Sequence, residues 1–252
     1  MNILRSLSIL GLTALLFLSQ PIAGEPGPDA RTIMRQATEA SGGDAWRLAK
    51  TNLMTGNATL YRDGRGVYAD RYEMRRIYPR QLSAAHTSSG KFRLDAYTKD
   101  TLLFTMSFDG ERMYNQNGPL PDEQASETAA SNFGFSAVRF ALDEGFSLAR
   151  MADDQVAGHP AYFVQVTDPG GGKTLVAVDK QSWLIRSVGW QTPRGWHVRI
   201  YDNYYQANEA GFMQPGHVRL YYDGVKTGDI NWTGAEINLE LPDALFQPVK
   251  AD

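Results

Sequence analysis

The sequence predicts a mainly β protein: an incomplete antiparallel β-barrel, formed by one curved sheet of about 11 strands, with an N-terminal helix and a helical lid. Three observations lead to this prediction. From residue 51 onward, apolar and polar residues alternate with the period of two that is typical of half-buried strands. Turn sequences such as Asp63-Gly64 and Asp223-Gly224 recur about every 10–20 residues, as in an antiparallel meander. A helical pattern interrupts the strands once, near residues 124–145.

Residues 1–24 are predicted to be a secretory signal peptide. Arg5 supplies a positive charge, residues 6–19 form a largely apolar run, and Gly24 is a small residue at the cleavage position. The run is shorter than the about 20 apolar residues that a membrane-spanning helix requires, so an uncleaved anchor is the weaker alternative. Residues 25–252 are then expected to form a single domain, soluble in the periplasm and monomeric.

Helices and strands are expected in a defined order after the signal peptide. Asp29 is predicted to cap a helix over residues 30–41, which Gly42 and Gly43 would end. A first set of strands is expected near residues 51–62, 66–77, 80–88, 91–98, 101–108 and 111–115. A second set is expected near residues 160–167, 173–179, 183–191, 196–205, 212–223 and 226–238. The helical insert lies between the two sets.

The insert is apolar on two helical faces. Phe133 and Phe140 share one face, and Phe135, Val138 and Leu142 share the other. A helix of this kind is either buried or in contact with apolar groups on both sides. Because an open curved sheet has a concave side that must be filled, we expect the insert to lie over that side as a lid.

Strand residues opposite the lid also carry apolar stripes. Leu102, Phe104, Met106 and Phe108 alternate along one strand, and Trp196 begins a similar stripe on a later strand. Each stripe by itself is typical of an ordinary core. Together with the lid, the stripes predict a hydrophobic cavity that binds a ligand. Its predicted lining comprises Leu102, Phe104, Met106, Phe108, Phe133, Phe135, Val138, Phe140, Leu142 and Trp196.

The sequence carries no pattern typical of catalysis or metal binding. The segment TDPGGGKT, residues 167–174, ends like a phosphate-binding loop, but Thr167 stands where the first glycine is required and a strand follows instead of a helix. This segment is therefore predicted to be a turn. There is no G-x-S-x-G motif, no cysteine, and no metal-type spacing among the histidines. We expect neither enzyme activity, nor a metal, nor a cofactor, and the lack of any block of like charge argues against a nucleic-acid partner.

Three segments resemble the LolA/LolB lipoprotein-carrier superfamily. Residues 102–119 resemble the strand, Asp-Gly turn and strand that precede the helical insert in that family. Residues 161–206 resemble its second series of hairpins, with a glycine-rich turn and a Tyr-x-x-Tyr end. Residues 237–248 resemble its closing strand and its Pro-Asp-x-x-Phe tail.

The resemblance implies a periplasmic carrier that takes acyl chains of lipoproteins or lipids into its cavity for transfer towards the outer membrane. It implies an inner-membrane transporter and an outer-membrane acceptor as partners. In that family, an arginine directly before a proline on an early strand holds the lid. Here Tyr78 precedes Pro79, and Arg75, Arg76 and Arg80 lie nearby.

Two other classes of function remain open at this point. An envelope sensor or scaffold protein would bind another protein on the same curved sheet and would have no catalytic activity. A small hydrolase is disfavoured because the sequence lacks a recognisable triad and metal-ligand spacing.

Overall fold

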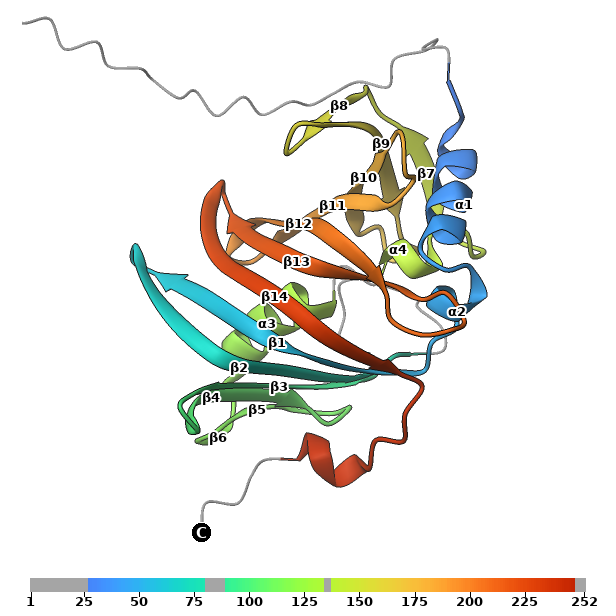
Figure 1. Ribbon diagram of the computed structural model, residues 1–252. Coiled ribbons are helices and arrows are strands. Elements are labelled where there is room, and N and C mark those ends of the chain that lie inside the picture. Colours follow the sequence, from blue (N-terminus) through green and yellow to red (C-terminus); the bar gives the residue numbers. More distant parts are fainter. Residues whose placement is uncertain (1–26, 80–88, 134–136, 248–252) are drawn as a thin grey trace, which may run out of the picture.

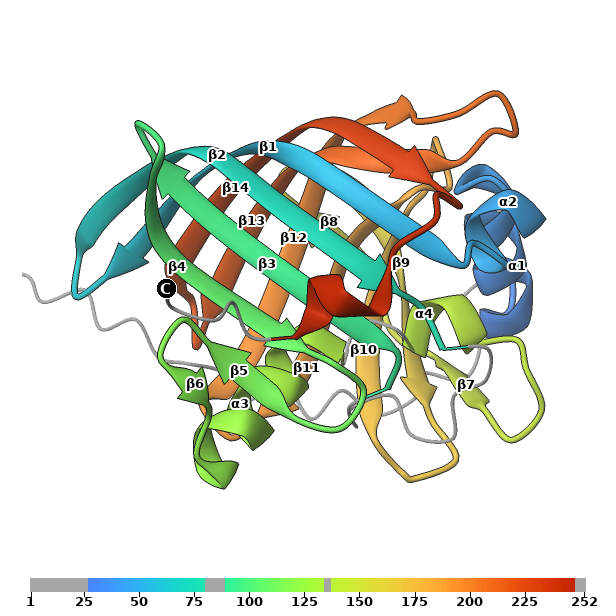
Figure 2. The ribbon, with the colours of Figure 1, turned by 90° about the horizontal axis from the view of Figure 1, so that it is seen from below.

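One antiparallel sheet dominates the computed structural model, which describes residues 27–79, 89–133 and 137–247. The sheet has 14 strands and curves around a concave side (Figure 1; Figure 2). This arrangement confirms the predicted fold class. The predicted signal peptide, the strand expected near residues 80–88, and Phe135 lie outside the described residues.

The strands form two runs along the chain. The first run is β1 (Thr51–Arg62), β2 (Arg65–Ile77), β3 (Lys91–Thr98), β4 (Thr101–Phe108), β5 (Met113–Asn115) and β6 (Gly118–Pro119). The second run is β7 (Ser147–Arg150), β8 (Asp154–Val156), β9 (His159–Thr167), β10 (Lys173–Asp179), β11 (Ile185–Thr192), β12 (Gly195–Gln206), β13 (Met213–Tyr222) and β14 (Val225–Ile237). The long strands lie where alternation predicts them. The expectation of about 11 strands was too low because β6, β7 and β8 are too short to show a period of two.

The order of the strands joins the two runs in the middle of the sheet. It is β6-β5-β4-β3-β2-β1-β14-β13-β12-β11-β10-β9-β7, and β8 also pairs with β9. β1 pairs antiparallel with β14, so the first and last long strands are neighbours. Among the described strands, β6 and β7 form the two ends of this order and do not pair with each other. The barrel is therefore incomplete, with an open side between its edges.

Tight Asp-Gly turns fix the register of the long hairpins. Asp63 and Gly64 both have positive φ angles, 51° and 74°, between β1 and β2. Asp223 and Gly224 repeat this at 47° and 79° between β13 and β14. Two-residue turns with positive φ at both positions match the right-handed twist of the strands, and Asp and Gly tolerate that conformation best.

Five short helices complete the described chain. α1 (Ala30–Ala40) begins after Asp29, whose Oδ1 accepts a hydrogen bond from the Thr32 amide at 2.7 Å, and it packs on β7 and β9. α2 (Asp44–Arg47) follows, and the 3-10 helix η2 (Asp243–Phe246) packs on β3. α3 (Asp122–Phe133) contacts β5 and β11, which belong to different halves of the sheet, so it crosses the open side. α4 (Ala137–Phe140) contacts α2 and β10. No described helix is long and apolar enough to span a bilayer.

The insert differs from the single helix predicted near residues 124–145. α3 ends at Phe133, α4 ends at Phe140, and a turn then leads to β7. The sequence carries Gly134 between the two helices, and glycine is a poor helix former. Most of α3 is polar, so the apolar residues of the predicted lid fall at its end, on α4 and in the following turn.

Two clusters of buried side chains pack on the concave side. One lies with α1 and α4 and includes Ile33, Phe140 and Trp190. The other lies on β1–β4, β13 and β14 and includes Phe92 and Trp232. Residues from both clusters also line a cavity, so the concave side is only partly filled by the protein itself.

Candidate ligand-binding cavity

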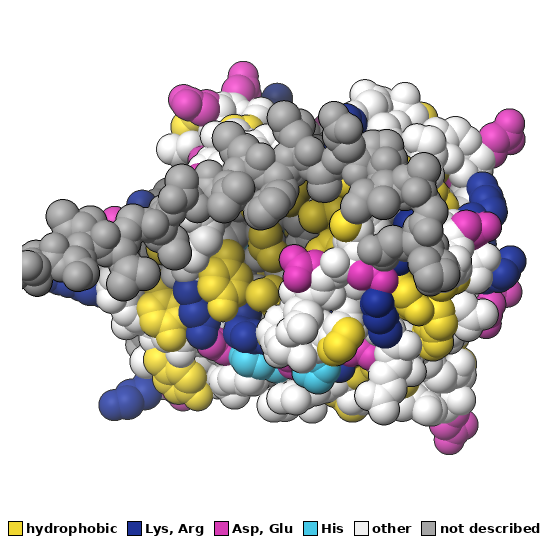
Figure 3. All heavy atoms as spheres, turned by 90° about the horizontal axis from the view of Figure 1, so that it is seen from above, with side chains coloured by type: hydrophobic (Ala, Val, Ile, Leu, Met, Phe, Trp, Pro, Cys, Tyr) yellow, Lys and Arg dark blue, Asp and Glu magenta, His cyan; other side chains and the backbone are white. Residues whose placement is uncertain are grey.

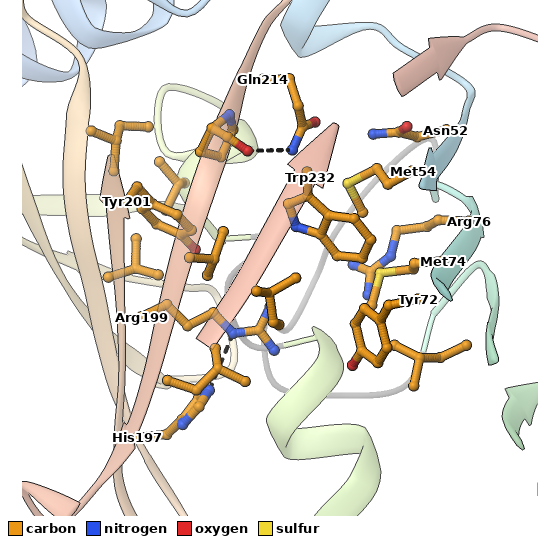
Figure 4. A pocket seen from close by; sticks show the side chains of 18 of the residues that line it. Asn52, Met54, Tyr72, Met74, Arg76, His197, Arg199, Tyr201, Gln214 and Trp232 are labelled. Carbon is orange, nitrogen blue, oxygen red and sulfur yellow. Dashed lines mark hydrogen bonds between the residues drawn. The ribbon is translucent and has the colours of Figure 1, made fainter. Parts of the chain in front are cut away.

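A cavity of about 460 Å³ lies on the concave side of the sheet. Its walls come from β1–β4 and β11–β14, with further residues from α3 and α4. Ligand sites commonly have volumes of about 300–1,000 Å³ and combine apolar walls with a few polar groups. Both kinds of wall are present here (Figure 4).

The apolar wall follows from the register of the first four strands. Met54, Met74, Leu94 and Met106 are direct neighbours across β1, β2, β3 and β4. Paired residues project to the same face of a sheet, so these four side chains form one row. Three of them are methionines, whose flexible side chains adapt to apolar ligands of varied shape.

An aromatic pair continues the apolar wall. Gly56 of β1 lies in register between Trp232 of β14 and Tyr72 of β2. The rings of Tyr72 and Trp232 are both buried and lie next to each other, with ring centroids 5.4 Å apart. Burial raises the pKa of Tyr72, and Arg199 opposes that shift, so the hydroxyl is a neutral hydrogen-bond donor at physiological pH.

The polar wall is built mainly by β12. His197, Arg199 and Tyr201 alternate along this strand and face the cavity (Figure 4). The Arg199 Nε donates to the His197 Nε2 at 3.1 Å, while the His197 Nδ1 lies 3.0 Å from the Tyr221 carbonyl oxygen. The imidazole is therefore neutral, with its proton on Nδ1. Burial, reinforced by the positive charge of Arg199, lowers the pKa of His197 to about 3.

A second polar group lies near α4. Arg76 of β2 is 2% exposed and lines the cavity in register with Asn52. The Arg139 guanidinium lies 3.9 Å from the centre of the Tyr78 ring and donates to the Ala49 carbonyl oxygen at 3.3 Å. Arg139 thus ties α4 to the end of β2 and to the segment after α2. In this contact the arginine, Arg139, belongs to the helical insert, and its partner Tyr78 follows strand β2.

Part of the predicted lining reaches this cavity. Phe104, Met106 and Val138 line it. Phe108 is buried in the cluster on β1–β4, beside the cavity. α3 ends at Phe133, whose side chain is outside the described part of the structure.

Other residues of the predicted lining lie elsewhere. Phe140 is buried in the cluster beneath α1, and Leu142 packs against that cluster. Leu102 is 38% exposed. The pairing of β3 and β4 shifts between Ala96 and Tyr97, so side chains before the shift point to the opposite face from the one that the alternation predicts. The side chain on the buried side there is Leu103.

Trp196 lies on the outer, convex face. It is 37% exposed, and its ring covers Gly189 of the neighbouring strand. The apolar stripe that begins at Trp196 therefore faces outward, while His197 and Arg199 face inward. Alternation separates the two faces of a strand but does not say which face is concave, so the sequence pattern did not indicate these polar lining residues.

The cavity offers binding groups but no recognisable catalytic constellation within the described residues. No cluster of three or more His, Cys, Asp or Glu side chains in the described ranges could hold a metal ion. The buried histidine is neutral and hydrogen-bonded through both ring nitrogens. The cavity can enclose the apolar part of a ligand, and its cationic and hydroxyl groups can interact with a polar part of the same ligand.

Comparisons with known proteins agree on the fold. No protein-family model matches the sequence, and no curated protein matches it significantly. A LolA superfamily protein from Nitrosomonas europaea is similar in structure with a TM-score of 0.52 and 12% identity, over 88% of this chain and 98% of that chain. A domain named for outer membrane lipoprotein sorting, from Vibrio parahaemolyticus, has a TM-score of 0.50 and 11% identity, over 86% and 95%. A DUF1329 family protein from Desulfovibrio piger has a TM-score of 0.52 and 10% identity, over 88% and 98%. The chain has the fold of the LolA superfamily.

Proposed function

We propose that this protein is a periplasmic carrier that takes acyl chains of lipoproteins or lipids into its cavity for transfer towards the outer membrane. The observation that carries this proposal is the apolar row of Met54, Met74, Leu94 and Met106 inside a cavity on the concave side. Apolar surface that the protein does not cover itself is available to a ligand. The fold shared with a lipoprotein-sorting domain supports the same role.

The proposal includes export and a lid. Residues 1–24 would act as the signal peptide, and no catalysis or cofactor would be involved. α3 would be the lid, because it crosses the open side and contributes Glu127 and Thr128 to the cavity. Among the side chains described in α3, residues 122–129, only Ala129 is fully buried, so this part of the helix loses little apolar contact when it moves aside. An inner-membrane transporter and an outer-membrane acceptor would be the partners.

Native mass spectrometry of the protein purified from the periplasm, followed by lipid extraction, tests this function. We expect the mature chain to carry one acyl-chain compound and to pass it to acceptor vesicles. A protein that emerges empty, binds no lipid added to it, and forms a stable complex with another protein would favour the sensor or scaffold role instead. An uncleaved, membrane-bound chain would contradict the periplasmic location.

A further inference from the structure

The charged groups of the cavity are almost all of one sign. Among the described residues that line it, the basic side chains are Arg76, Arg139, Arg194 and Arg199. The described lining contains a single carboxylate, Glu127 of α3. The lining therefore combines an extended apolar wall with an excess of positive charge.

Two of the arginines come from opposite sides of the cavity. Arg76 is carried by β2 and Arg199 by β12, which belong to different halves of the sheet. Figure 4 shows both side chains extending into the cavity, near Met74 and Tyr72 on one side and Tyr201 on the other. The apolar row and the cationic groups thus share one space.

The cations are close enough to affect one another. Burial lowers the pKa of Arg76 to about 10, and the positive charges of Arg199 and Arg139 add to this effect, whereas Tyr78 opposes it. Burial raises the pKa of Tyr201 to about 12, against the influence of Arg199 and Arg76. Arg76 remains protonated at neutral pH, in surroundings that disfavour its charge.

An anion in this position would be stabilised in two ways. It would interact with more than one guanidinium in a site with little water, where charge-assisted hydrogen bonds are strong. It would also offset the repulsion between the cations. A neutral ligand would do neither, and it would leave the cost of burying Arg76 unchanged.

We propose that the ligand is an amphiphile whose anionic head group, a carboxylate or a phosphate, lies between Arg76 and Arg199 while its acyl chain lies along the methionine row. This inference rests on the proposed function and narrows it from acyl chains in general to anionic lipids. At about 30 Å³ per water-sized group, the cavity of about 460 Å³ has room for roughly fifteen such groups. That is enough for a carboxylate head group and about twelve carbons of one acyl chain.

Binding of two ligands that differ only in charge tests the proposal. The lipid-free mature protein is titrated at pH 8 with oleate and with oleyl alcohol, using the fluorescence of the native tryptophans. We expect oleate to bind about tenfold or more tightly than the alcohol. Oleoyl-lysophosphatidylglycerol shows whether a phosphate head group is accepted as well, and acetate and inorganic phosphate show whether the chain is needed.

Variants assign the preference to the two arginines. Arg76→Met and Arg199→Met should reduce the ratio of oleate to alcohol affinity towards one, whereas Arg76→Lys and Arg199→Lys should retain part of it. Arg65→Met, on the exposed start of β2, is the matched control and should leave the ratio unchanged.

The possible failures are distinct. Equal affinity of the wild-type protein for oleate and oleyl alcohol would overturn the anionic-lipid proposal but leave the carrier function in place, and this result needs no variant to fold. Binding of neither compound would contradict the carrier function itself. Tight binding of acetate or phosphate alone would indicate a small-anion site and would also overturn the proposal.

Discussion

The two faces of the sheet treat their charged residues differently. On the outer face of β2–β4, Arg75 and Arg93 both donate to the buried carboxylate of Asp95, at 3.1 and 2.8 Å. Thr105 donates to the same carboxylate at 2.6 Å. On the concave face, one residue further along β2, Arg76 lies in a lining that contains several cations and one described carboxylate.

The second half of the sheet repeats this contrast. On the outer face, Arg186 contacts Asp179 at 2.9 Å and Asp202 at 3.2 Å, and Arg219 also pairs with Asp202. In the view from above in Figure 3, basic and acidic side chains also lie close to one another, most clearly at the right of the molecule. On the same strand as Asp202, Arg199 faces inward.

The difference separates charges that serve the fold from charges available to a ligand. A buried carboxylate with two guanidinium partners is compensated within the chain, so removing it takes an ion-pair partner from both cations. The cavity, in contrast, is lined by more basic than acidic side chains among the described residues, and burying this excess of positive charge costs stability in the ligand-free protein. Variants of the two faces should therefore change stability in opposite directions.

The largest effect is expected from Asp95→Ala. This change leaves Arg75 and Arg93 without their shared carboxylate, and breaking a buried ion pair typically costs about 3–5 kcal/mol of unfolding free energy. Chemical denaturation measures it. Asp243→Ala is the control, because its carboxylate is 75% exposed and its pair with Lys91 should contribute about 1 kcal/mol or less. Equal losses in the two variants would mean that the buried network does not stabilise the fold.

A change of the opposite sign is expected from Arg76→Met. The pKa of Arg76 is lowered from 12.5 to about 10, chiefly by burial, so the folded state disfavours the charge, and this cost is relieved only as the pH rises through about 10. At about 1.4 kcal/mol per pKa unit, the cost is on the order of 3 kcal/mol. We expect the ligand-free variant to be more stable than wild type by up to that amount, less the hydrogen bonds that it loses. A clear loss of stability would show that Arg76 serves the fold.

The strand positions were predictable because local chemistry determines them. The period of two after residue 51 and the Asp-Gly turns fix where the long strands begin and end. Gly42 and Gly43 likewise follow the first helix. None of these signals depends on residues that are distant in the sequence.

The cavity was less predictable because its walls depend on the direction in which the sheet curves. The apolar stripe from Trp196 faces outward, and a shift in pairing exposes Leu102. The contact between Arg139 and Tyr78 joins residues far apart in the chain, and spacing alone does not predict it. A sign that could have been noticed is the alternation of His197, Arg199 and Tyr201, which is as regular as the apolar stripe beside it.

A smaller effect is expected from acid, through His197. Its pKa is about 3 in the folded protein, lowered first by burial and then by Arg199, compared with about 6.5 when unfolded. Because the unfolded chain takes up this proton first, stability falls as the pH decreases from 6.5 towards 3. At pH 5 the loss from this group is about 2 kcal/mol. The difference in unfolding free energy between wild type and His197→Gln, measured at pH 7 and pH 5, isolates it. A difference that does not change with pH would mean that His197 is not buried in its neutral form.

The smallest effect is expected from Lys173→Ala, which removes a positive charge at the exposed start of β10, away from the cavity lining. Residues 168–172 form a turn between β9 and β10, as the sequence predicts: the Gly172 amide donates to the Asp168 Oδ1 at 2.8 Å, and β10 begins at Lys173. The Lys173 side chain is exposed, and exposed substitutions usually change stability by about 0.5 kcal/mol or less. The affinity for oleate should also stay the same, because solvent and salt screen a charge at this turn. Fluorescence titration and denaturation of the variant check both expectations. A loss of oleate affinity as large as that of Arg199→Met would mean that overall charge, rather than the position of the cations in the cavity, determines binding. Nucleotide binding by the wild-type protein that disappears in Lys173→Ala would mean that the turn binds a phosphate.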